Sequence, residues 1–227
     1  MELKHKVVFI TGGTKGLGRA LALSFLKENA HVAICARDEE ELLTTPEGIL
    51  GIKADVTKES ELQNVVEIVK TKFGHLDIWV NNAGIWLPHL PTEETDWKRA
   101  HDLMEVNLFG IVYGSKVALA QMRKQGSGSI VNIISTSGLE GKVNETAYCA
   151  SKFAANGFTQ SLRKEVDGVK IKVISIFPGV MKTNLFDEKV PANYQDYMEP
   201  SFVAEKIIEN LKKEKPEEEL IIKRLIV

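Results

Sequence analysis

The chain has 227 residues, 44% of them hydrophobic and 26% charged, and this composition is typical of a globular protein with one core. Its net charge of −2 gives no indication of a nucleic-acid partner, and no apolar stretch approaches the roughly 18 residues that a membrane span needs. The first predicted strand begins at about residue 6, leaving no room for a signal peptide, and the two cysteines show neither disulfide nor metal-ligand spacing, so we expect a cytoplasmic protein.

Short β-branched apolar runs alternate with longer amphipathic segments along the chain. Strands are predicted near 6–10, 31–36, 49–54, 77–80, 129–134, 171–176 and 219–223. Helices are predicted near 16–28, 38–44, 59–73, 95–124, 148–166 and 201–213. This alternation predicts a single α/β domain over 1–227, built as a Rossmann-type doubly wound parallel sheet of about seven strands with helices on both faces.

The first strand leads directly into a glycine-rich turn. Gly12, Gly16 and Gly18 permit a tight turn and close approach of a ligand to the backbone. A helix that begins near Gly16 offers free N–H groups and the positive end of its dipole to a pyrophosphate. Strand, turn and helix together predict a dinucleotide site, although the spacing G-x-x-x-G-x-G differs from the commoner G-x-G-x-x-G.

Further motifs follow in chain order, and most begin where a predicted strand ends. They are Asn81-Asn82-Ala83-Gly84 after strand 77–80, Asn107 within helix 95–124, Ser135 and Gly138 after strand 129–134, and Pro178, Gly179 and Thr183 after strand 171–176. Because ligands of doubly wound sheets bind beyond the carboxyl ends of the strands, the motifs that follow strands should converge with the glycine turn at one edge.

Tyr148 and Lys152 stand four residues apart on a predicted helix and therefore share one face. A free tyrosine has a pKa of about 10, and a nearby cation favours the phenolate and lowers that pKa. The pair can therefore act as a tuned proton donor. The same spacing also arises by chance, as a surface lysine beside a core tyrosine, and only the remaining motifs argue against that interpretation.

In these motifs the chain resembles the short-chain dehydrogenase/reductase family over almost its whole length. The T-G-x-x-x-G-x-G of that family corresponds to Thr11, Gly12, Gly16 and Gly18, and its N-N-A-G, helical asparagine, S-x-x-G, Y-x-x-x-K and P-G-x-x-x-T correspond to the motifs above. The spacing argues against the extended relatives, which carry T-G-x-x-G-x-x-G. The resemblance implies an oxidoreductase that uses a nicotinamide cofactor, and the sequence shows no cluster with metal-ligand spacing.

The resemblance also implies catalytic roles for four residues. Tyr148 would exchange a proton with the substrate oxygen, and Ser135 would hydrogen-bond that oxygen. Lys152 would lower the Tyr148 pKa and bind the nicotinamide ribose. Asn107 would hold a water that connects Lys152 to solvent.

Cofactor contacts are implied for residues of several of these motifs. Asp55 would receive the adenine amino group, Ala83 and Gly84 would let the backbone approach the adenosine ribose, and Thr183 would bind the nicotinamide carboxamide. The complete implied set is Thr11, Gly12, Thr14, Lys15, Gly16, Leu17, Gly18, Arg37, Asp55, Val56, Asn82, Ala83, Gly84, Tyr148, Lys152, Pro178, Gly179 and Thr183.

The charge at the end of the second strand bears on the choice of cofactor. An acidic residue there binds the ribose hydroxyls of NAD, whereas cations bind the 2′-phosphate of NADP. This chain has Arg37 at that position, and Lys15 of the glycine turn is within reach of the same phosphate. Asp38 slightly weakens the argument. We therefore expect NADP(H) in preference to NAD.

The expected reaction is hydride transfer between NADP(H) and a small carbonyl or alcohol substrate. A short substrate lid is predicted at about 184–200, and Trp86, Leu87 and His89 are candidates for the opposite wall, with His89 expected to be exposed. A 3-oxoacyl-carrier-protein reductase and a non-catalytic NADP(H) sensor stay open as alternatives. Family resemblance and small residues in helices 95–124 and 148–166 predict a homodimer or homotetramer, and neither a nucleic-acid nor a membrane partner is expected.

Overall fold

Seven strands form one parallel sheet in the computed structural model, which describes residues 2–224. The strands are β1 (Val7–Thr11), β2 (His31–Ala36), β3 (Ile49–Lys53), β4 (Ile78–Asn81), β5 (Gly128–Ile133), β6 (Ile171–Pro178) and β7 (Glu219–Ile222). Their order is β3-β2-β1-β4-β5-β6-β7, and every neighbouring pair is parallel. The predicted fold class is therefore confirmed; Met1 and residues 225–227 of the predicted domain lie outside the described residues.

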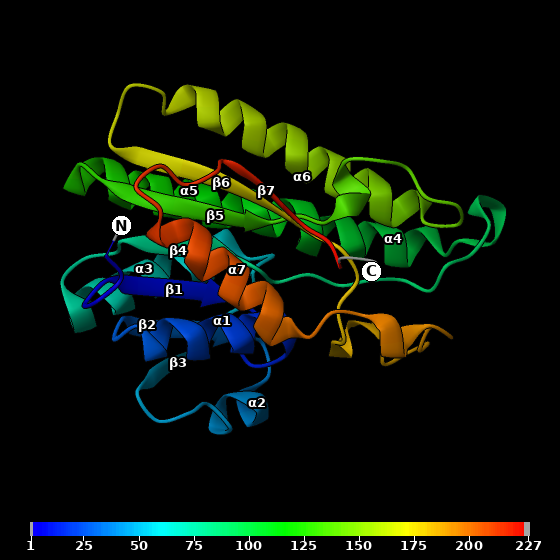
Figure 1. The fold of residues 1–227 in the computed structure, drawn as a ribbon, viewed down its shortest axis with the longest axis horizontal. Helices are drawn as coiled ribbons and strands as arrows, with labels where there is room; N and C mark the ends of the chain where they lie inside the picture. The colour runs from blue at the N-terminus through cyan, green and yellow to red at the C-terminus, as the bar shows by residue number, and fades with distance from the viewer. Residues whose placement is uncertain (1, 225–227) are drawn as a thin grey trace.

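Helices cover both faces of the sheet (Figure 1). They are α1 (Gly16–Lys27), α2 (Glu39–Leu43), α3 (Glu59–Phe73), α4 (Trp97–Met104), α5 (Gly110–Gln125), α6 (Thr146–Glu165) and α7 (Pro200–Lys212). Alternate residues of β1 point to opposite sides: Val8 and Ile10 pack against α1 and α7, whereas Val7 and Phe9 pack on the side of α3, α5 and α6. Burial on both faces explains why β1 reads as an unbroken apolar run.

The order of the strands creates a crevice between β1 and β4. The chain leaves β1 toward β2 on one side of the sheet and leaves β4 toward β5 on the other. This reversal is the position at which doubly wound sheets bind their ligands. The glycine turn follows β1 and the Asn-Asn-Ala-Gly motif follows β4, so both motifs lie at the reversal point.

A buried polar network fixes the centre of the sheet. Asn81 of β4 pairs in register with Asn132 of β5, and its side-chain amide donates to Asn132 Oδ1 at 2.8 Å and to Ser115 Oγ at 3.0 Å. Its Oδ1 accepts the Trp79 indole N–H at 2.6 Å. A Cβ on Gly114 of α5 would lie 2.0 Å from Asn81 Oδ1, so only glycine allows α5 this close to the network.

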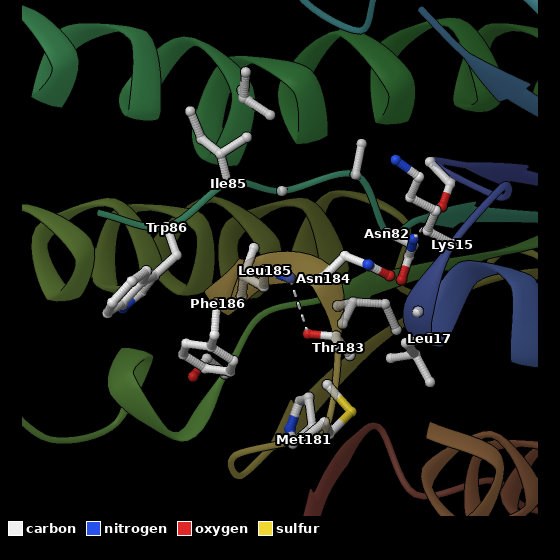
Figure 2. A pocket seen from close by; sticks show the side chains of 18 of the residues that line it. Lys15, Leu17, Asn82, Ile85, Trp86, Met181, Thr183, Asn184, Leu185 and Phe186 are labelled. Atoms are coloured by element: carbon white, nitrogen blue, oxygen red, sulfur yellow. Dashed lines mark hydrogen bonds between the residues drawn. The ribbon is translucent and has the colours of Figure 1, made fainter. Parts of the chain in front are cut away.

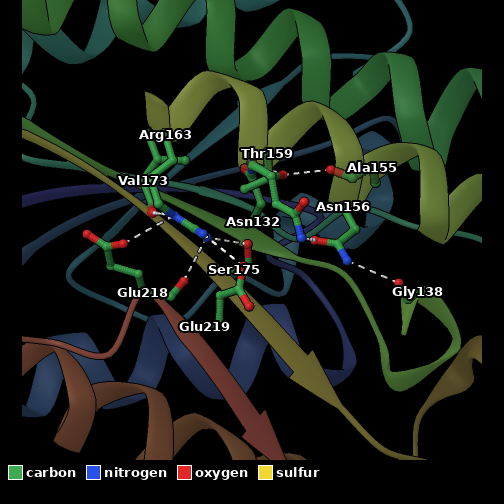
Figure 3. Close-up of polar contacts among 11 residues, drawn as sticks. Asn132, Gly138, Ala155, Asn156, Thr159, Arg163, Val173, Ser175, Glu218 and Glu219 are labelled. Carbon is green, nitrogen blue, oxygen red and sulfur yellow. Dashed lines mark hydrogen bonds and ion pairs between the residues drawn. The ribbon is translucent and has the colours of Figure 1, made fainter. Parts of the chain in front are cut away.

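α6, which carries Tyr148 and Lys152, is tied to the sheet by polar side chains along its length (Figure 3). Asn132 donates to Thr159 Oγ1 at 2.9 Å, and Asn156 donates to the carbonyl of Gly138 at 3.1 Å. The Arg163 guanidinium donates to Val173 O at 3.0 Å and to Ser175 Oγ at 2.8 Å on β6, and it contacts Glu219 of β7 at 2.8 Å. These bonds fix the rotation of α6 relative to the strand ends.

The prediction of one continuous α-helix over 95–124 is wrong in one respect, because the helix is interrupted. A π-helical segment, Glu105–Phe109, separates α4 from α5. Asn107 lies in this segment, where its side chain is fully buried and bonds both backbone groups of Ile85. The apolar periodicity continues through the segment, so the sequence pattern did not reveal the wider turn; π segments of this kind are frequent at functional sites.

The expectation that no stretch is apolar enough for a membrane span is wrong for one segment: the helical stretch Trp97–Gln125 meets that criterion by length and composition, with a mean hydropathy of 1.3 in its most apolar part. Half of that part is buried inside the protein, where α5 packs against β4 and β5. A core helix that covers a sheet has the same properties, so this stretch is weak evidence for a membrane span.

Candidate active site

The glycine turn holds the backbone in a form that only glycine adopts easily. Gly12 and Gly16 have φ of +63° and +50°. A Cβ on Gly18 would lie 2.1 Å from the carbonyl oxygen of Gly12, so α1 packs directly on the turn. No side chain caps the first turn of α1, which leaves its N–H groups available to a pyrophosphate. The close backbone approach and the uncapped helix both fit a dinucleotide.

Hydrogen bonds join the turn to the end of β4. The Thr11 hydroxyl accepts the N–H groups of Asn82 and Ala83 at 2.9 and 3.0 Å. The Asn82 amide donates to the carbonyls of Thr11 and Gly12 at 2.9 and 3.0 Å. These bonds explain why a threonine stands at position 11 and an asparagine at position 82. Together the two side chains hold the two sides of the crevice at a fixed separation.

A cavity of about 970 Å³ opens at the carboxyl ends of the strands. Most of the predicted site residues line it: Gly12, Thr14, Lys15, Gly16, Leu17, Arg37, Val56, Asn82, Ala83, Gly84, Ser135, Tyr148, Lys152, Pro178, Gly179 and Thr183. Figure 2 shows one part of the wall, where Thr183 and Asn184 lie close to Leu17 and Asn82. The structure thus brings together residues that are more than 170 positions apart in sequence.

Four predicted residues do not line this cavity. Thr11 and Gly18 support the turn, as described above. Asp55 accepts hydrogen bonds from the N–H and the hydroxyl of Thr57, both at 2.9 Å, so its predicted adenine contact stays a prediction. Asn107 donates to Ile85 O and accepts from Ile85 N, and it lies beneath Gly84.

Ser135, Tyr148 and Lys152 meet on one wall of the cavity. Ser135 and Tyr148 are joined by a side-chain hydrogen bond, and Lys152 Nζ lies 5.6 Å from the centre of the Tyr148 ring. Ser135 has a φ of 156°, which is rarely seen for a residue with a side chain and is typical of strained functional positions. The arrangement gives a phenol with a hydroxyl partner and a nearby cation.

The titration of this group differs from the sequence-based expectation. Burial raises the pKa of Tyr148, and the hydrogen bond from Ser135 only partly opposes that effect. Burial also lowers the pKa of Lys152 to about 8, and the residue is only 4% exposed. The expected lowering of the Tyr148 pKa is therefore not found for the protein by itself, because loss of water around the phenol outweighs the hydrogen bond from Ser135.

At the far end of the cavity a carboxylate adds to the predicted cation pair. Glu41 of α2 forms an ion pair with Lys15 at 2.7 Å and accepts the Thr14 hydroxyl at 2.7 Å. This hydrogen bond and ion pair raise the pKa of Lys15 and lower that of Glu41. Sequence reasoning missed Glu41 because the residue lies on a short helix, far from the glycine turn along the chain.

The other end of the cavity is lined by aromatic side chains and by Glu145, a second carboxylate that the sequence did not predict. Trp86 packs edge-on against Phe186, with ring centres 5.1 Å apart, and both line the cavity (Figure 2). Leu185 and Tyr197 of the predicted lid also line it, whereas Leu87, Tyr194 and Met198 do not. His89 is exposed, as expected, yet it contacts the carboxylate of Glu145.

The fold and the position of this cavity are those of the doubly wound class of proteins. A family profile described as short chain dehydrogenase matches residues 6–193, and the chain belongs to that family. Its relatives are oxidoreductases too, which agrees with this family assignment. An uncharacterized oxidoreductase of Staphylococcus saprophyticus is 36% identical over 193 residues, covering 82% of each chain. L-fucose dehydrogenase of Mus musculus is 38% identical over 186 residues, covering 81% of this chain and 68% of its own.

Solved structures agree in fold and hold nicotinamide cofactors of both kinds. The structure of ElxO with NADP bound has a TM-score of 0.86 and 30% identity, covering 96% of this chain and 97% of its own. A 3-ketoacyl-(acyl-carrier-protein) reductase from Brucella melitensis, complexed with NADH, has a TM-score of 0.89 and 26% identity, covering 97% of both chains. Related proteins thus bind either NADP or NADH.

Proposed function

We propose that this protein catalyses the reversible, NADPH-dependent reduction of small ketones or aldehydes to alcohols. The observation that carries the proposal is the meeting of Ser135, Tyr148 and Lys152 on the wall of the cavity that the glycine turn also lines. A nicotinamide cofactor bound there would supply or accept hydride. The protein supplies the proton and the orientation of the substrate oxygen.

Each of the three side chains has a role that its position supports. Tyr148 gives its hydroxyl proton to the substrate oxygen as that oxygen gains charge, and takes it back in the reverse direction. Ser135 donates a hydrogen bond to the same oxygen and fixes its position. Lys152, buried beside the phenol, favours the phenolate that remains and passes a proton back to it.

The preference for NADPH rests on Arg37. This exposed cation follows β2 and lines the cavity, where a guanidinium can bind a 2′-phosphate through two parallel hydrogen bonds. Lys15 supports the same preference less strongly than the sequence suggested, because its charge is already compensated by Glu41. We therefore propose NADPH as the preferred cofactor, with NADH as a poorer one.

We also propose a cytoplasmic homodimer or homotetramer with no nucleic-acid or membrane partner. Two aromatic side chains on the outer side of the helical layer, Phe109 and Phe153, are 38% and 46% exposed, and Gly157 of α6 has no neighbour where its Cβ would be. Ala118 and Ala155 do not contribute to this surface, because both are fully buried in the core. Helices with exposed aromatic rings suit contact with a second copy of the chain.

The direct test is a screen of aldehydes and ketones with NADPH and NADH, and of alcohols with the oxidised cofactors. The absorbance of the reduced cofactor reports turnover in both directions. Turnover with NADPH and a carbonyl compound, retained in EDTA, is the expected result. Tight binding of NADPH without turnover of any compound would instead favour the sensor function. Activity restricted to acyl-carrier-protein thioesters would favour the 3-oxoacyl reductase.

A further inference from the structure

The proposed mechanism leaves unused a carboxylate that lines the substrate end of the cavity. Glu145 lies immediately before α6, three residues ahead of Tyr148, and its side chain is only 12% exposed. Its Oε2 accepts a hydrogen bond from the Ser137 hydroxyl at 3.2 Å. Its Oε1 lies 3.1 Å from His89 Nε2. Two partners from different parts of the chain thus contact this carboxylate at the cavity wall.

The carboxylate keeps hydrogen-bonding capacity toward the cavity. A carboxylate has about four acceptor positions, of which Ser137 and His89 use one each. His89 also has an alternative partner, because the Trp86 indole N–H lies 3.3 Å from the same Nε2. One ring nitrogen cannot accept from Trp86 and donate to Glu145 at the same time. A substrate hydroxyl can therefore take the place of His89 on Oε1 while His89 bonds to Trp86.

Glu145 lies close to the reacting groups. Ser137, which bonds to Glu145, also donates its backbone N–H to Ser135 Oγ at 3.1 Å. Burial is the main cause of the raised pKa of Tyr148, and the negative charge of Glu145 adds to that effect. The same two causes, in the same order, raise the pKa of Tyr197 in the predicted lid. A substrate whose carbonyl oxygen meets Ser135 and Tyr148 places its neighbouring atoms near Glu145.

We propose that Glu145 recognises the substrate by accepting a hydrogen bond from a hydroxyl group close to the reacting carbonyl, so that the substrates are uncharged hydroxycarbonyl compounds and the products are polyols. This inference rests on the proposed reductase function and names its substrate class. A keto acid would bring a second negative charge against a carboxylate that is mostly shielded from water, and like charges in such surroundings repel strongly.

A cation in the same cavity, Lys142, would instead favour a negatively charged substrate. Lys142 lines the cavity, and its Nζ donates to the Thr136 hydroxyl at 3.4 Å. It also lines a neighbouring cavity of about 730 Å³ together with Lys223 and Arg224. Lys142 thus faces a region that is shared with other cations, whereas Glu145 bonds to the residue that bonds to Ser135. The balance between these two charges is what the experiment must decide.

The test compares three ketones that differ at one position. Hydroxyacetone and 2-butanone have nearly the same shape and differ in one hydroxyl group, and acetoacetate carries a carboxylate. We expect the wild-type protein to have its highest kcat/KM with hydroxyacetone and its lowest with acetoacetate. A wild-type preference for acetoacetate would overturn the proposal and assign the dominant charge to Lys142. If none of the three ketones reacts although another carbonyl compound of the screen does, the inference fails and the reductase function stands; if no compound of the screen reacts, the reductase function itself fails.

The variant Glu145→Gln removes the charge and keeps the shape of the side chain. Its ratio of kcat/KM for hydroxyacetone over 2-butanone should fall by about ten-fold, because Gln keeps an acceptor oxygen but loses the charge, and hydrogen bonds to charged groups are stronger than those between neutral groups. The ratio for acetoacetate over 2-butanone should rise by a similar factor. Glu140→Gln, an exposed carboxylate nearby that does not line the cavity, should change neither ratio. Unchanged ratios in a Glu145→Gln protein that binds NADPH would overturn the inference and leave the reductase function standing.

Discussion

Tyr148 provides the sharpest test at the level of single residues. Its hydroxyl bonds to Ser135, and Lys152 lies beside its ring. Tyr148→Phe removes only the proton donor, so we expect turnover to fall by about 10²–10⁴-fold, the usual contribution of general acid–base catalysis. NADPH affinity, measured by fluorescence titration, should stay nearly unchanged. Tyr113→Phe, a tyrosine that does not line the cavity, is the control, and near-normal turnover in Tyr148→Phe would rule out the mechanism.

The pH dependence should follow the buried pair of Tyr148 and Lys152. Burial lowers the pKa of Lys152 from its ordinary 10.5 to about 8 and raises that of Tyr148, so the pair loses its first proton near pH 8. Reduction uses the pair with this proton, and oxidation uses the pair without it. We expect reduction to be constant below pH 7 and to fall as the pH rises through about 8, while oxidation rises over the same range. Profiles of kcat measured in both directions would contradict this if neither changed between pH 7 and 9.

Two substitutions at the far end of the cavity should change cofactor preference in opposite directions. Arg37→Asp removes a phosphate contact and should reduce the preference for NADPH over NADH by roughly 1.5–3 kcal/mol. Glu41→Gln releases Lys15 from its ion pair and should increase that preference. The measurement is the ratio of kcat/KM for the two cofactors in each variant. An unchanged ratio in Arg37→Asp would show that Arg37 faces solvent in the complex.

The site residues that the sequence predicted are those with a recognisable local pattern. Glycines after a strand and a tyrosine four residues before a lysine can be found without a structure, since their spacing along the chain carries the information. Glu41 and Glu145 carry no such pattern, because their partners Lys15 and His89 come from distant loops. Glu145 does precede Tyr148 by three residues, but it lies just before α6 begins at Thr146, and the predicted helix began only at residue 148.

At the level of elements, the packing of α1 on the glycine turn allows a prediction about stability. A methyl group on Gly18 would meet the carbonyl of Gly12, and neither backbone can move away without opening the turn. Gly18→Ala should lower the free energy of unfolding by about 1–3 kcal/mol, the usual cost of overpacking, and should also weaken cofactor binding. Thermal unfolding and NADPH titration measure the two effects. Gly141→Ala, where a Cβ meets nothing within 4 Å, is the control.

The π segment shows where prediction of elements from sequence ends. Residues 95–124 keep a helical apolar period, and this pattern located the helices α4 and α5 correctly. The wider turn lies where the Asn107 side chain makes two hydrogen bonds to Ile85, which stands 22 residues earlier in the chain, between β4 and α4. An interaction between segments far apart in the chain leaves no trace in local periodicity. The doubly wound parallel sheet, in contrast, could be predicted. A chain in which strands and helices alternate can follow only a few paths.

For the whole molecule, the exposed helical face predicts self-association. Phe109 of the π segment and Phe153 of α6 leave apolar rings in water at 38% and 46% exposure. We expect light scattering at micromolar concentration to give at least twice the chain mass of 25.2 kDa. Phe153→Glu should shift the protein toward monomer, because a charge cannot be buried in such an interface without a partner. A monomeric wild-type protein would contradict the proposed assembly.

The attachment of α6 through Arg163 has a consequence for how the protein is made. Arg163 bonds to β6 and also to Glu218 O and Glu219 of the segment that forms β7. β7 follows every other strand of the sheet along the chain, so a ribosome delivers it after all of them. Until then, α6 lacks part of its anchorage, although Tyr148 and Lys152 were synthesised about seventy residues earlier. The nascent protein can thus complete its nucleotide-binding half well before its proton donor is held in position, and catalytic competence should be acquired only as synthesis nears the last strand.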